Sequence, residues 1–335
     1  MIQKRRLKIQ EIKHSVELSE EAADREVVEG VLVFSALKES VERSQAELID
    51  TIKEKQRQTQ KQAEGFIKML EQEISELKKR STEVEQLSRS EDPLHLLQSF
   101  RTLSTAPPTK DWTGVRVSAP SYEGTVVRAV HQLEKKLSKQ MKLLELKRVQ
   151  QSAVDVTLDP DTAHPQLILS DDGKQVKHGD VRKNLPDNPE RFNLYPIVLG
   201  NQSFSSGRFY YEVQVKGKTG WVLGVVEESI NRKGDISASP QDGCWTIRLR
   251  NKNNYSACDD TPVRLSLESW PEKVGVFVDY EEGLVSFYDV GAAALIYSFT
   301  DCCFTDDLYP YFSPCHDNKG KNSAPLIISA VNHTE

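Results

Sequence analysis

Apolar side chains recur at helical intervals along the first 92 residues, with charged and amide side chains between them. The recurring apolar positions are Leu48, Ile52, Ala63, Phe66, Leu70, Ile74, Leu77, Val84 and Leu87. Steps of three, four and four from Ala63 to Ile74 give an eleven-residue period, whereas flanking steps are closer to seven. Such mixing favours a locally unwound supercoil. The stretch contains no proline and only two glycines, Gly30 and Gly65, so the pattern predicts one long helix over residues 1–92.

An isolated helix of this length cannot bury its own apolar stripe. A rise of 1.5 Å per residue makes it about 140 Å long, and helices in water gain most of their stability by packing an apolar face against a partner. We therefore predict that residues 1–92 form a coiled coil with a second copy of the chain. A single solvated helix stabilised by ion pairs is the alternative interpretation.

Prolines separate this predicted rod from a second helix. Pro93 follows the rod, and Pro107 and Pro108 favour extended backbone because each proline disfavours helix at the preceding residue. Residues 93–122 are therefore interpreted as a turn and linker. Residues 123–152 then carry one apolar helical face. That face comprises Val130, Leu133, Leu137, Met141 and Leu144. We expect this shorter, returning helix to pack on the rod.

From residue 153 to residue 335 the period changes to that of β-strands. Apolar positions Phe209, Tyr211, Val213 and Val215 alternate with Tyr210, Glu212, Gln214 and Lys216. The first set is predicted to be buried and the second exposed. Residues 274–279 and 284–289 flank a turn that ends in Gly283, as in a hairpin. Further strands are predicted at residues 167–169, 221–226, 245–250, 295–299 and 326–331. The pattern is typical of an all-β sandwich.

Residue types that carry catalysis or bind metals form no recognisable constellation. All five cysteines follow residue 243 and none forms a CxxC pair, which disfavours a disulfide framework and a zinc site. The seven histidines are scattered, without metal-ligand spacing or a glycine-flanked serine. In the Cys302-Cys303 pair, alternation predicts one packed and one exposed thiol. We expect no catalytic residue, no metal and no cofactor in this chain.

Hydropathy points to a cytoplasmic protein without membrane contact. No apolar run approaches the roughly 20 residues that a bilayer requires. The first thirty residues are charged and lack the apolar segment of a signal peptide.

The two halves of the chain differ in net charge. Residues 155–335 hold 17 Lys and Arg against 26 Asp and Glu, a net charge of −9, and residues 1–154 carry +3. A domain of this charge is a poor general phosphate binder, so nucleic acid is not the expected partner. A local basic patch at Arg248, Arg250 and Lys252 keeps RNA binding as an alternative.

Motifs over residues 153–331 resemble the PRY-SPRY, or B30.2, domain in their order and spacing. They are LDPDTAHPQL at 158–167, LGNQSFSSGRFYYEV at 199–213, WVLGV at 221–225 with RKG at 232–234, GCWT at 243–246, VFVDY at 276–280, VSFY at 285–288 and YPYFSP at 309–314. Tyr211 departs from the family, which usually has tryptophan there, but it keeps an aromatic core residue.

The preceding residues resemble the same family. A long rod followed by EDPLHLLQSF at 91–100 is similar to tripartite-motif (TRIM) proteins of the fish-expanded type. The resemblance implies antiparallel rods, and a target-binding half of a ubiquitin-protein ligase, often in antiviral innate immunity. Family members carry a zinc-binding RING and B-box before the rod, yet residues 1–152 contain no cysteine. A purely structural oligomerisation scaffold is a further alternative.

Four residues are candidate protein contacts. Alternation from Trp245 to Arg250 places Thr246, Arg248 and Arg250 outward. In an antibody-binding member of the family, the positions that match the two arginines are contact tryptophans, and Glu228 and His316 match an acidic and an aromatic contact. The resemblance therefore implies an unidentified protein target, other than antibody, that presents acidic or aromatic groups to this face. Alternatively, both arginines are merely solvated strand residues.

Overall fold

The computed structural model describes residues 2–89, 93–94, 109–236, 238–267 and 269–331. They divide into two compact units, Met1–Leu137 and Ser138–Glu335. Residues 90–92 of the predicted rod and 95–108 of the predicted linker lie outside the described residues, as does most of the 91–100 motif.

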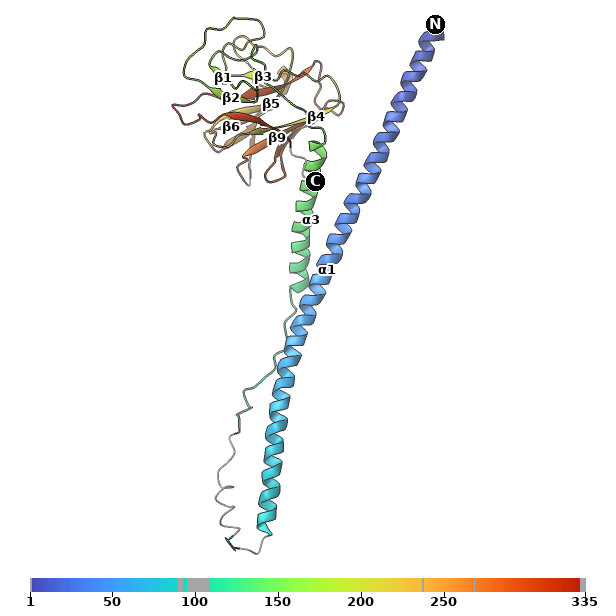
Figure 1. Ribbon diagram of the computed structural model, residues 1–335, viewed down its shortest axis with the longest axis vertical. Coiled ribbons are helices and arrows are strands. Elements are labelled where there is room, and N and C mark those ends of the chain that lie inside the picture. Colours follow the sequence, from blue (N-terminus) through green and yellow to red (C-terminus); the bar gives the residue numbers. More distant parts are fainter. Residues whose placement is uncertain (1, 90–92, 95–108, 237, 268, 332–335) are drawn as a thin grey trace. The chain divides into compact units, whose positions relative to one another are not determined.

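The first unit is built on helix α1 (Ile2–Ser88), drawn in blue in Figure 1. Charged pairs one turn apart stabilise it by a few tenths of a kcal/mol each, as Glu39 and Arg43 do at 2.6 Å. Large apolar side chains remain exposed along the helix, among them Val27, Val28, Val31, Leu32 and Phe34. The long predicted helix is therefore confirmed, and many of its large apolar side chains are exposed to solvent in the described part of the chain.

Two contacts tie later segments to α1 within this unit. The Trp112 indole Nε1 donates a hydrogen bond to the Glu73 carboxylate at 2.9 Å, and its ring meets Phe66 edge-on. Helix α3 (Thr125–Gln150) contributes the second contact, an ion pair between Lys136 Nζ and the Glu47 carboxylate at 3.2 Å.

The second unit contains a sandwich of two antiparallel sheets, and the predicted all-β sandwich is confirmed (Figure 1). The larger sheet has the order β1 (Leu167–Leu169), β2 (Gln175–His178), β13 (Leu326–Ser329), β4 (Arg208–Gln214), β9 (Lys273–Asp279), β10 (Leu284–Asp289) and β11 (Ala294–Phe299). The smaller sheet has the order β3 (Val198–Leu199), β12 (Leu308–Ser313), β5 (Trp221–Glu227), β6 (Cys244–Arg250), β7 (Asn254–Ala257) and β8 (Val263–Leu265).

The main core lies between the two sheets. Phe209, Tyr211 and Val213 of β4 contribute to it, together with Trp221 and Trp245 of the facing sheet. The Tyr211 hydroxyl donates a hydrogen bond of 2.6 Å to the backbone oxygen of Gly224, so the aromatic substitute for the family's tryptophan satisfies its polar group.

The prediction that alternate residues of β4 face solvent is wrong for Tyr210 and Glu212, which are 0% and 1% exposed. The C-terminal turns of α3 cover this outer face, with Leu146 and Val149 in one cluster with Tyr210. Such burial is tolerated because the Glu212 carboxylate is fully partnered. It accepts hydrogen bonds from Gln150, Tyr210 and Lys273 at 2.8, 3.0 and 2.9 Å.

Five strands were not predicted, namely β2, β3, β7, β8 and β12. Strand β12 contains Pro310, which argues against a strand in sequence, and β3 has two residues. Here Pro310 accepts a hydrogen bond from Gly200, because the proline carbonyl remains available to the sheet.

Candidate functional site

A groove of about 500 Å³ opens beside strands β5, β6 and β12. Its apolar lining comes from Ile197, Val222, Leu249, Cys258 and Tyr311. Arg248, Arg250 and His316 also line it. The structure thus brings together three of the four predicted contact residues around one depression.

Arg248 is held in place by the neighbouring strand. It lies in β6 opposite Val222 of β5 and Ser256 of β7. Its Nε donates to the Ser256 hydroxyl at 2.9 Å. This hydrogen bond uses one of the five guanidinium N–H donors and restrains the Arg248 side chain. A ligand that binds the remaining donors therefore costs less side-chain entropy.

Arg250 ends β6 and is exposed, opposite Asn254 of β7. The turn that follows has positive φ at Asn251 and Lys252, 53° and 72°. The Lys252 backbone N–H donates to the Thr219 oxygen at 2.9 Å. Lys252 is absent from the groove lining, so the predicted three-residue basic patch contributes two arginines to the groove.

Thr246 is the exception to the predicted outward set, because it is completely buried. It pairs with Gly224 of β5, where an added Cβ would lie 2.1 Å from the Trp245 oxygen. A smaller core cluster that includes Val226, Cys244 and Tyr311 covers this end of the outer face. The face of β6 therefore becomes accessible only towards Arg248 and Arg250.

His316 follows β12 in a loop that is organised by a buried asparagine. Asn322 is 2% exposed. Its amide nitrogen donates to the backbone oxygens of Gly220, Pro314 and His316 at 3.0, 2.9 and 3.0 Å. Its amide oxygen accepts from the Thr219 and Gly220 N–H groups at 2.8 and 3.1 Å. Sequence reasoning missed Asn322, because a surface-type residue in a turn-rich segment carries no signal of burial.

A buried lysine supports the same loop. The Lys218 ammonium donates to the backbone oxygens of Asn322 and Ala324 at 3.2 and 2.9 Å. Burial lowers the pKa of Lys218 to about 8, and the negative charge that Cys315 and Asp317 can carry opposes this shift.

The His316 ring meets a second imidazole from β2. His316 Nδ1 lies 3.3 Å from His178 Nε2, and the rings cross at 70° with centroids 5.1 Å apart. Burial, followed by the proximity of His316, lowers the pKa of His178.

Glu228 does not line the groove. It is exposed just after β5, and its N–H donates to the Asp307 backbone oxygen at 2.9 Å. Its own backbone oxygen accepts from Arg232 at 3.3 Å. The carboxylate is presented on the loop beyond β5, separately from the arginine pair.

No group of three or more His, Cys, Asp or Glu residues in the described part of the chain is arranged to hold a metal ion. Of the adjacent cysteines, Cys303 is exposed and Cys302 is half-buried. Burial raises the pKa of Cys302 to about 12, so its thiol is protonated and unreactive at neutral pH. None of the helices in the described ranges combines the length and apolar character needed to cross a membrane.

Comparison with protein families matches nearly the whole chain in three consecutive segments. The TRIM protein coiled-coil region matches residues 2–143, the SPRY-associated domain (PRY) residues 156–204, and the SPRY domain residues 208–327. The chain belongs to the tripartite-motif family.

Curated relatives match slightly more than half of this TRIM chain. It is 45% identical to the erythroid membrane-associated protein of Mus musculus over 205 residues, covering 59% of this chain and 36% of the relative. Human pyrin is 48% identical over 187 residues, covering 56% and 24%. The E3 ubiquitin-protein ligase TRIM21 of Bos taurus is 45% identical over 185 residues, covering 54% and 39%. The chain thus spans well under half the length of each.

Among solved structures, the crystal structure of the TRIM65 PSpry domain aligns with a TM-score of 0.47 at 23% identity. The alignment covers 55% of this chain and 94% of that one.

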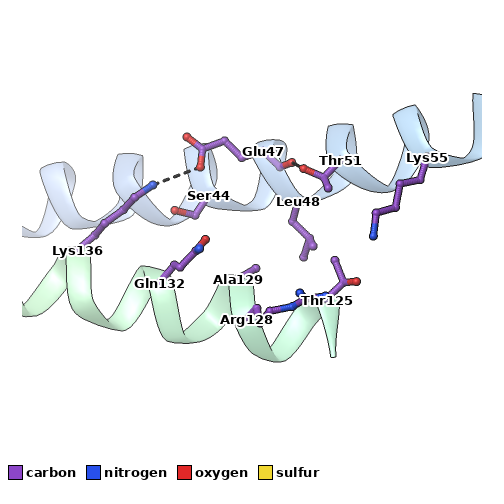
Figure 2. A pocket seen from close by; sticks show the side chains of 10 residues that line it. All are labelled: Ser44, Glu47, Leu48, Thr51, Lys55, Thr125, Arg128, Ala129, Gln132 and Lys136. Atoms are coloured by element: carbon purple, nitrogen blue, oxygen red, sulfur yellow. Dashed lines mark hydrogen bonds and ion pairs between the residues drawn. The ribbon is translucent and has the colours of Figure 1, made fainter. Parts of the chain in front are cut away.

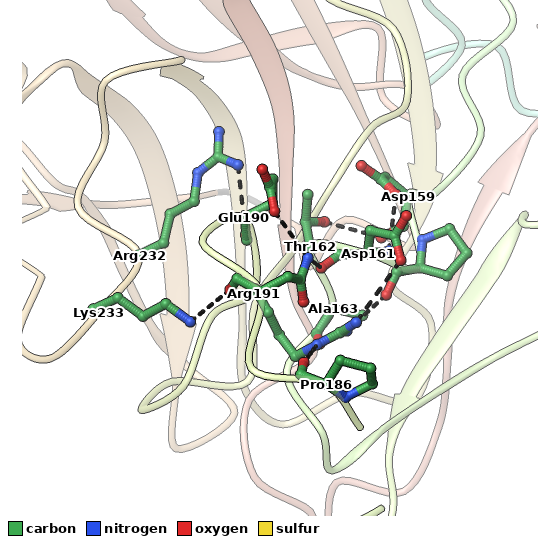
Figure 3. A network of polar contacts seen from close by, with 11 residues as sticks. Asp159, Asp161, Thr162, Ala163, Pro186, Glu190, Arg191, Arg232 and Lys233 are labelled. Carbon is green, nitrogen blue, oxygen red and sulfur yellow. Dashed lines mark hydrogen bonds and ion pairs between the residues drawn. The ribbon is translucent and has the colours of Figure 1, made fainter. Parts of the chain in front are cut away.

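A buried arginine joins parts of the PRY segment (Figure 3). Arg191 donates from Nε to the Pro186 oxygen at 2.9 Å, and from Nη1 to the Pro160 and Ala163 oxygens at 2.8 Å each. Its charge is balanced by Asp161 at 3.8 Å. Because backbone oxygens supply most of its partners, Arg191 is a structural clamp rather than a ligand-binding group.

The RKG motif of the SPRY segment binds to the same PRY loop. Lys233 pairs with the Asp187 carboxylate at 2.5 Å, and Arg232 lies 3.5 Å from the Glu190 oxygen. Figure 3 shows both side chains reaching the loop that carries Arg191. These contacts assign the motif to stabilising the PRY–SPRY junction, and neither Arg232 nor Lys233 lines the groove.

Proposed function

We propose that this TRIM chain is a dimeric protein-recognition scaffold whose PRY-SPRY groove binds a protein target. The observation that carries the proposal is the shared groove of Arg248, Arg250 and His316. Strands position both arginines, and the loop held by Asn322 positions the histidine. Binding energy in such interfaces is concentrated in a few anchored aromatic and arginine residues.

The lining favours one kind of target segment, in which an acidic side chain lies next to a large apolar one. The two guanidinium groups bind a carboxylate with directional hydrogen bonds. Beside them, Val222, Ile236 and Ala238 are half-buried and offer apolar surface for the neighbouring side chain. Glu228, outside the groove, would contact the target at its edge.

The rod supplies self-association in this proposal. The exposed apolar side chains of α1 are best covered by an antiparallel second copy of the chain. A dimer then carries two PRY-SPRY domains, and a target with two binding sites is held more tightly through avidity.

We further propose that the chain acts as the target-binding part of a ubiquitin-protein ligase in the cytoplasm, in innate immune or antiviral signalling. The supporting observation is the similarity to bovine TRIM21, whose name describes an E3 ubiquitin-protein ligase. A RING and B-box would supply the ligase activity, and residues 1–152 contain no cysteine for their zinc sites. This chain alone is therefore proposed to be non-enzymatic, without cofactor or membrane contact.

The test is a proximity-labelling or pull-down comparison between the wild type and Arg248→Ala/Arg250→Ala. The control Lys252→Ala/Arg264→Ala removes the same charge from exposed positions outside the groove. A target lost with the first variant and kept with the second supports the groove. If both variants still bind the target, the recognition surface lies elsewhere on the sandwich. The next candidates are residues 227–239 and residues 251–262, and the second range includes β7. Recovery of RNA that falls steeply with salt would instead support nucleic-acid binding.

A further inference from the structure

A second cavity, of about 320 Å³, lies between the middle of α1 and the first turns of α3 (Figure 2). Lys55 and Leu48 of α1 line it, together with Thr125, Arg128 and Lys136 of α3. All of these residues belong to the compact unit Met1–Leu137. The space equals roughly ten water molecules at ~30 Å³ each, so a small hydrated ion fits. We call this cavity the notch.

The notch includes the N-terminus of a long helix that lacks a capping side chain. α3 begins at Thr125 after Gly124, which has φ 69° and no side chain. The first turn contains no acidic residue. The first N–H groups of a helix have no intrahelical partner, and the helix dipole places partial positive charge there. Such a terminus attracts anions.

A buried hydroxyl in the notch independently indicates a missing ligand. Thr125 is 9% exposed, yet its Oγ1 has no hydrogen-bond partner. Buried polar groups normally have a partner, because leaving one unpaired costs free energy. In Figure 2 the Thr125 side chain rises from α3 into the space between the helices, and Lys55 reaches from α1 towards it.

The notch is lined by more cations than anions, namely Lys55, Arg128 and Lys136 against one carboxylate. Glu47 is the one acidic residue in its lining, and it pairs with Lys136 at 3.2 Å. Within the described residues, no carboxylate pairs with Lys55 or Arg128. Lys55 is moreover half-buried, and its long side chain reaches the notch.

We propose that the notch binds a phosphate-type oxyanion. The Thr125 hydroxyl donates a hydrogen bond to it, the positive end of the α3 dipole favours its charge, and Lys55 and Arg128 neutralise that charge. This site is independent of the proposed protein-recognition groove.

The test is isothermal titration of the full chain in phosphate-free, low-salt buffer, with inorganic phosphate as the first probe. We expect one saturable site per chain in the wild type, and at least ten-fold weaker binding in Thr125→Val and in Lys55→Met. Thr125→Val keeps the side-chain shape and removes the unpaired hydroxyl, so it should fold and melt as the wild type does. Lys53→Met is the matched control, because Lys53 is exposed on α1 and does not line the notch.

Glycerol 3-phosphate is the second probe and separates two sources of the ion. Binding of both probes indicates a phosphate carried on a larger molecule, and binding of inorganic phosphate alone indicates the free ion. The proposal is overturned if the wild type shows no saturable binding, as when a second rod fills the notch. It is also overturned if Thr125→Val and Lys55→Met bind like the wild type, or if Lys53→Met weakens binding equally.

Discussion

The Gln150 amide donates a hydrogen bond of 2.8 Å to the Glu212 carboxylate, linking the last residue of α3 to the outer face of β4. Leu146 and Val149 pack beside it against Tyr210. The contacts make the end of α3 part of the same core as the sandwich. Residues 138–150 accordingly belong to the compact unit Ser138–Glu335.

Leu146→Ala should therefore destabilise the sandwich by about 2–5 kcal/mol, the usual cost of truncating a buried leucine. Leu146 is 6% exposed, whereas Leu143 on the same helix is 43% exposed. Urea unfolding followed by the fluorescence of the buried Trp221 and Trp245 measures the effect. Leu143→Ala is the control and should change stability by about half a kcal/mol or less. Equal effects of both variants would contradict the docking of α3 on the sandwich.

His164 should make stability depend on pH. Burial, and then the nearby Arg182, lower the pKa of His164 from 6.5 to about 4. Above pH 6.5 both folded and unfolded chains carry a neutral ring, so its contribution to stability is complete. Between pH 6.5 and 4 only the unfolded state gains a proton, and up to about 3 kcal/mol is lost as pH falls.

The measurement is the unfolding free energy at pH 7 and pH 4.5 for the wild type, His164→Gln and His131→Gln. His131 is exposed, so its variant should follow the wild type. His164→Gln should lose less stability than the wild type on acidification. A parallel decline in all three would rule out His164 as the cause.

The rod should make the chain a constitutive dimer. Light scattering coupled to size exclusion should give twice the chain mass of 37.9 kDa at micromolar concentration. Ile74→Glu/Leu77→Glu places charges on exposed apolar positions of the predicted seam and should give monomers. The control Lys78→Glu/Lys79→Glu changes exposed charged positions and should remain dimeric. A monomeric wild type would refute self-association through α1.

Arg248→Ala/Arg250→Ala should weaken target affinity by about 2 kcal/mol or more, the scale of interface hot spots. The melting temperature should change little, because neither side chain belongs to the hydrophobic core. Calorimetric titration and thermal melting of one preparation measure both. With a bivalent target, the double substitution should reduce affinity more in the dimer than in the Ile74→Glu/Leu77→Glu monomer. The reason is that the dimer binds through two linked sites, and both are weakened. A lower melting temperature with proportionally weaker binding would instead indicate damage to the fold.

The chain alone should transfer no ubiquitin. No group of three or more potential metal ligands occurs in the described ranges, and the rod contains no cysteine. Autoubiquitination with purified activating and conjugating enzymes should yield no chains above background. If a re-purified sample still forms polyubiquitin, the ligase activity lies in the rod or the sandwich. That result would contradict the proposal that a RING and B-box supply it.

Much of the fold was predictable because its cause is local. Periodicity along α1 and alternation in β4, β9 and β10 reflect the geometry of single elements. The PRY-SPRY arrangement of residues 153–331 was instead indicated by the resemblance of their motifs to a known family, and the family models match it. Alternation likewise placed Arg248 and Arg250 on one side of β6, and the structure adds His316 beside them.

Tertiary packing alone decided the rest. Local alternation assigned Glu212 and Thr246 to solvent, but α3 covers the first, and a second core cluster encloses the second. The groove also required Asn322 and Lys218, polar residues whose burial depends on partners about a hundred positions away. A strand's own sequence states which residues share a face. Whether that face meets water depends on which distant segment packs on it, and that is set by the folded chain as a whole.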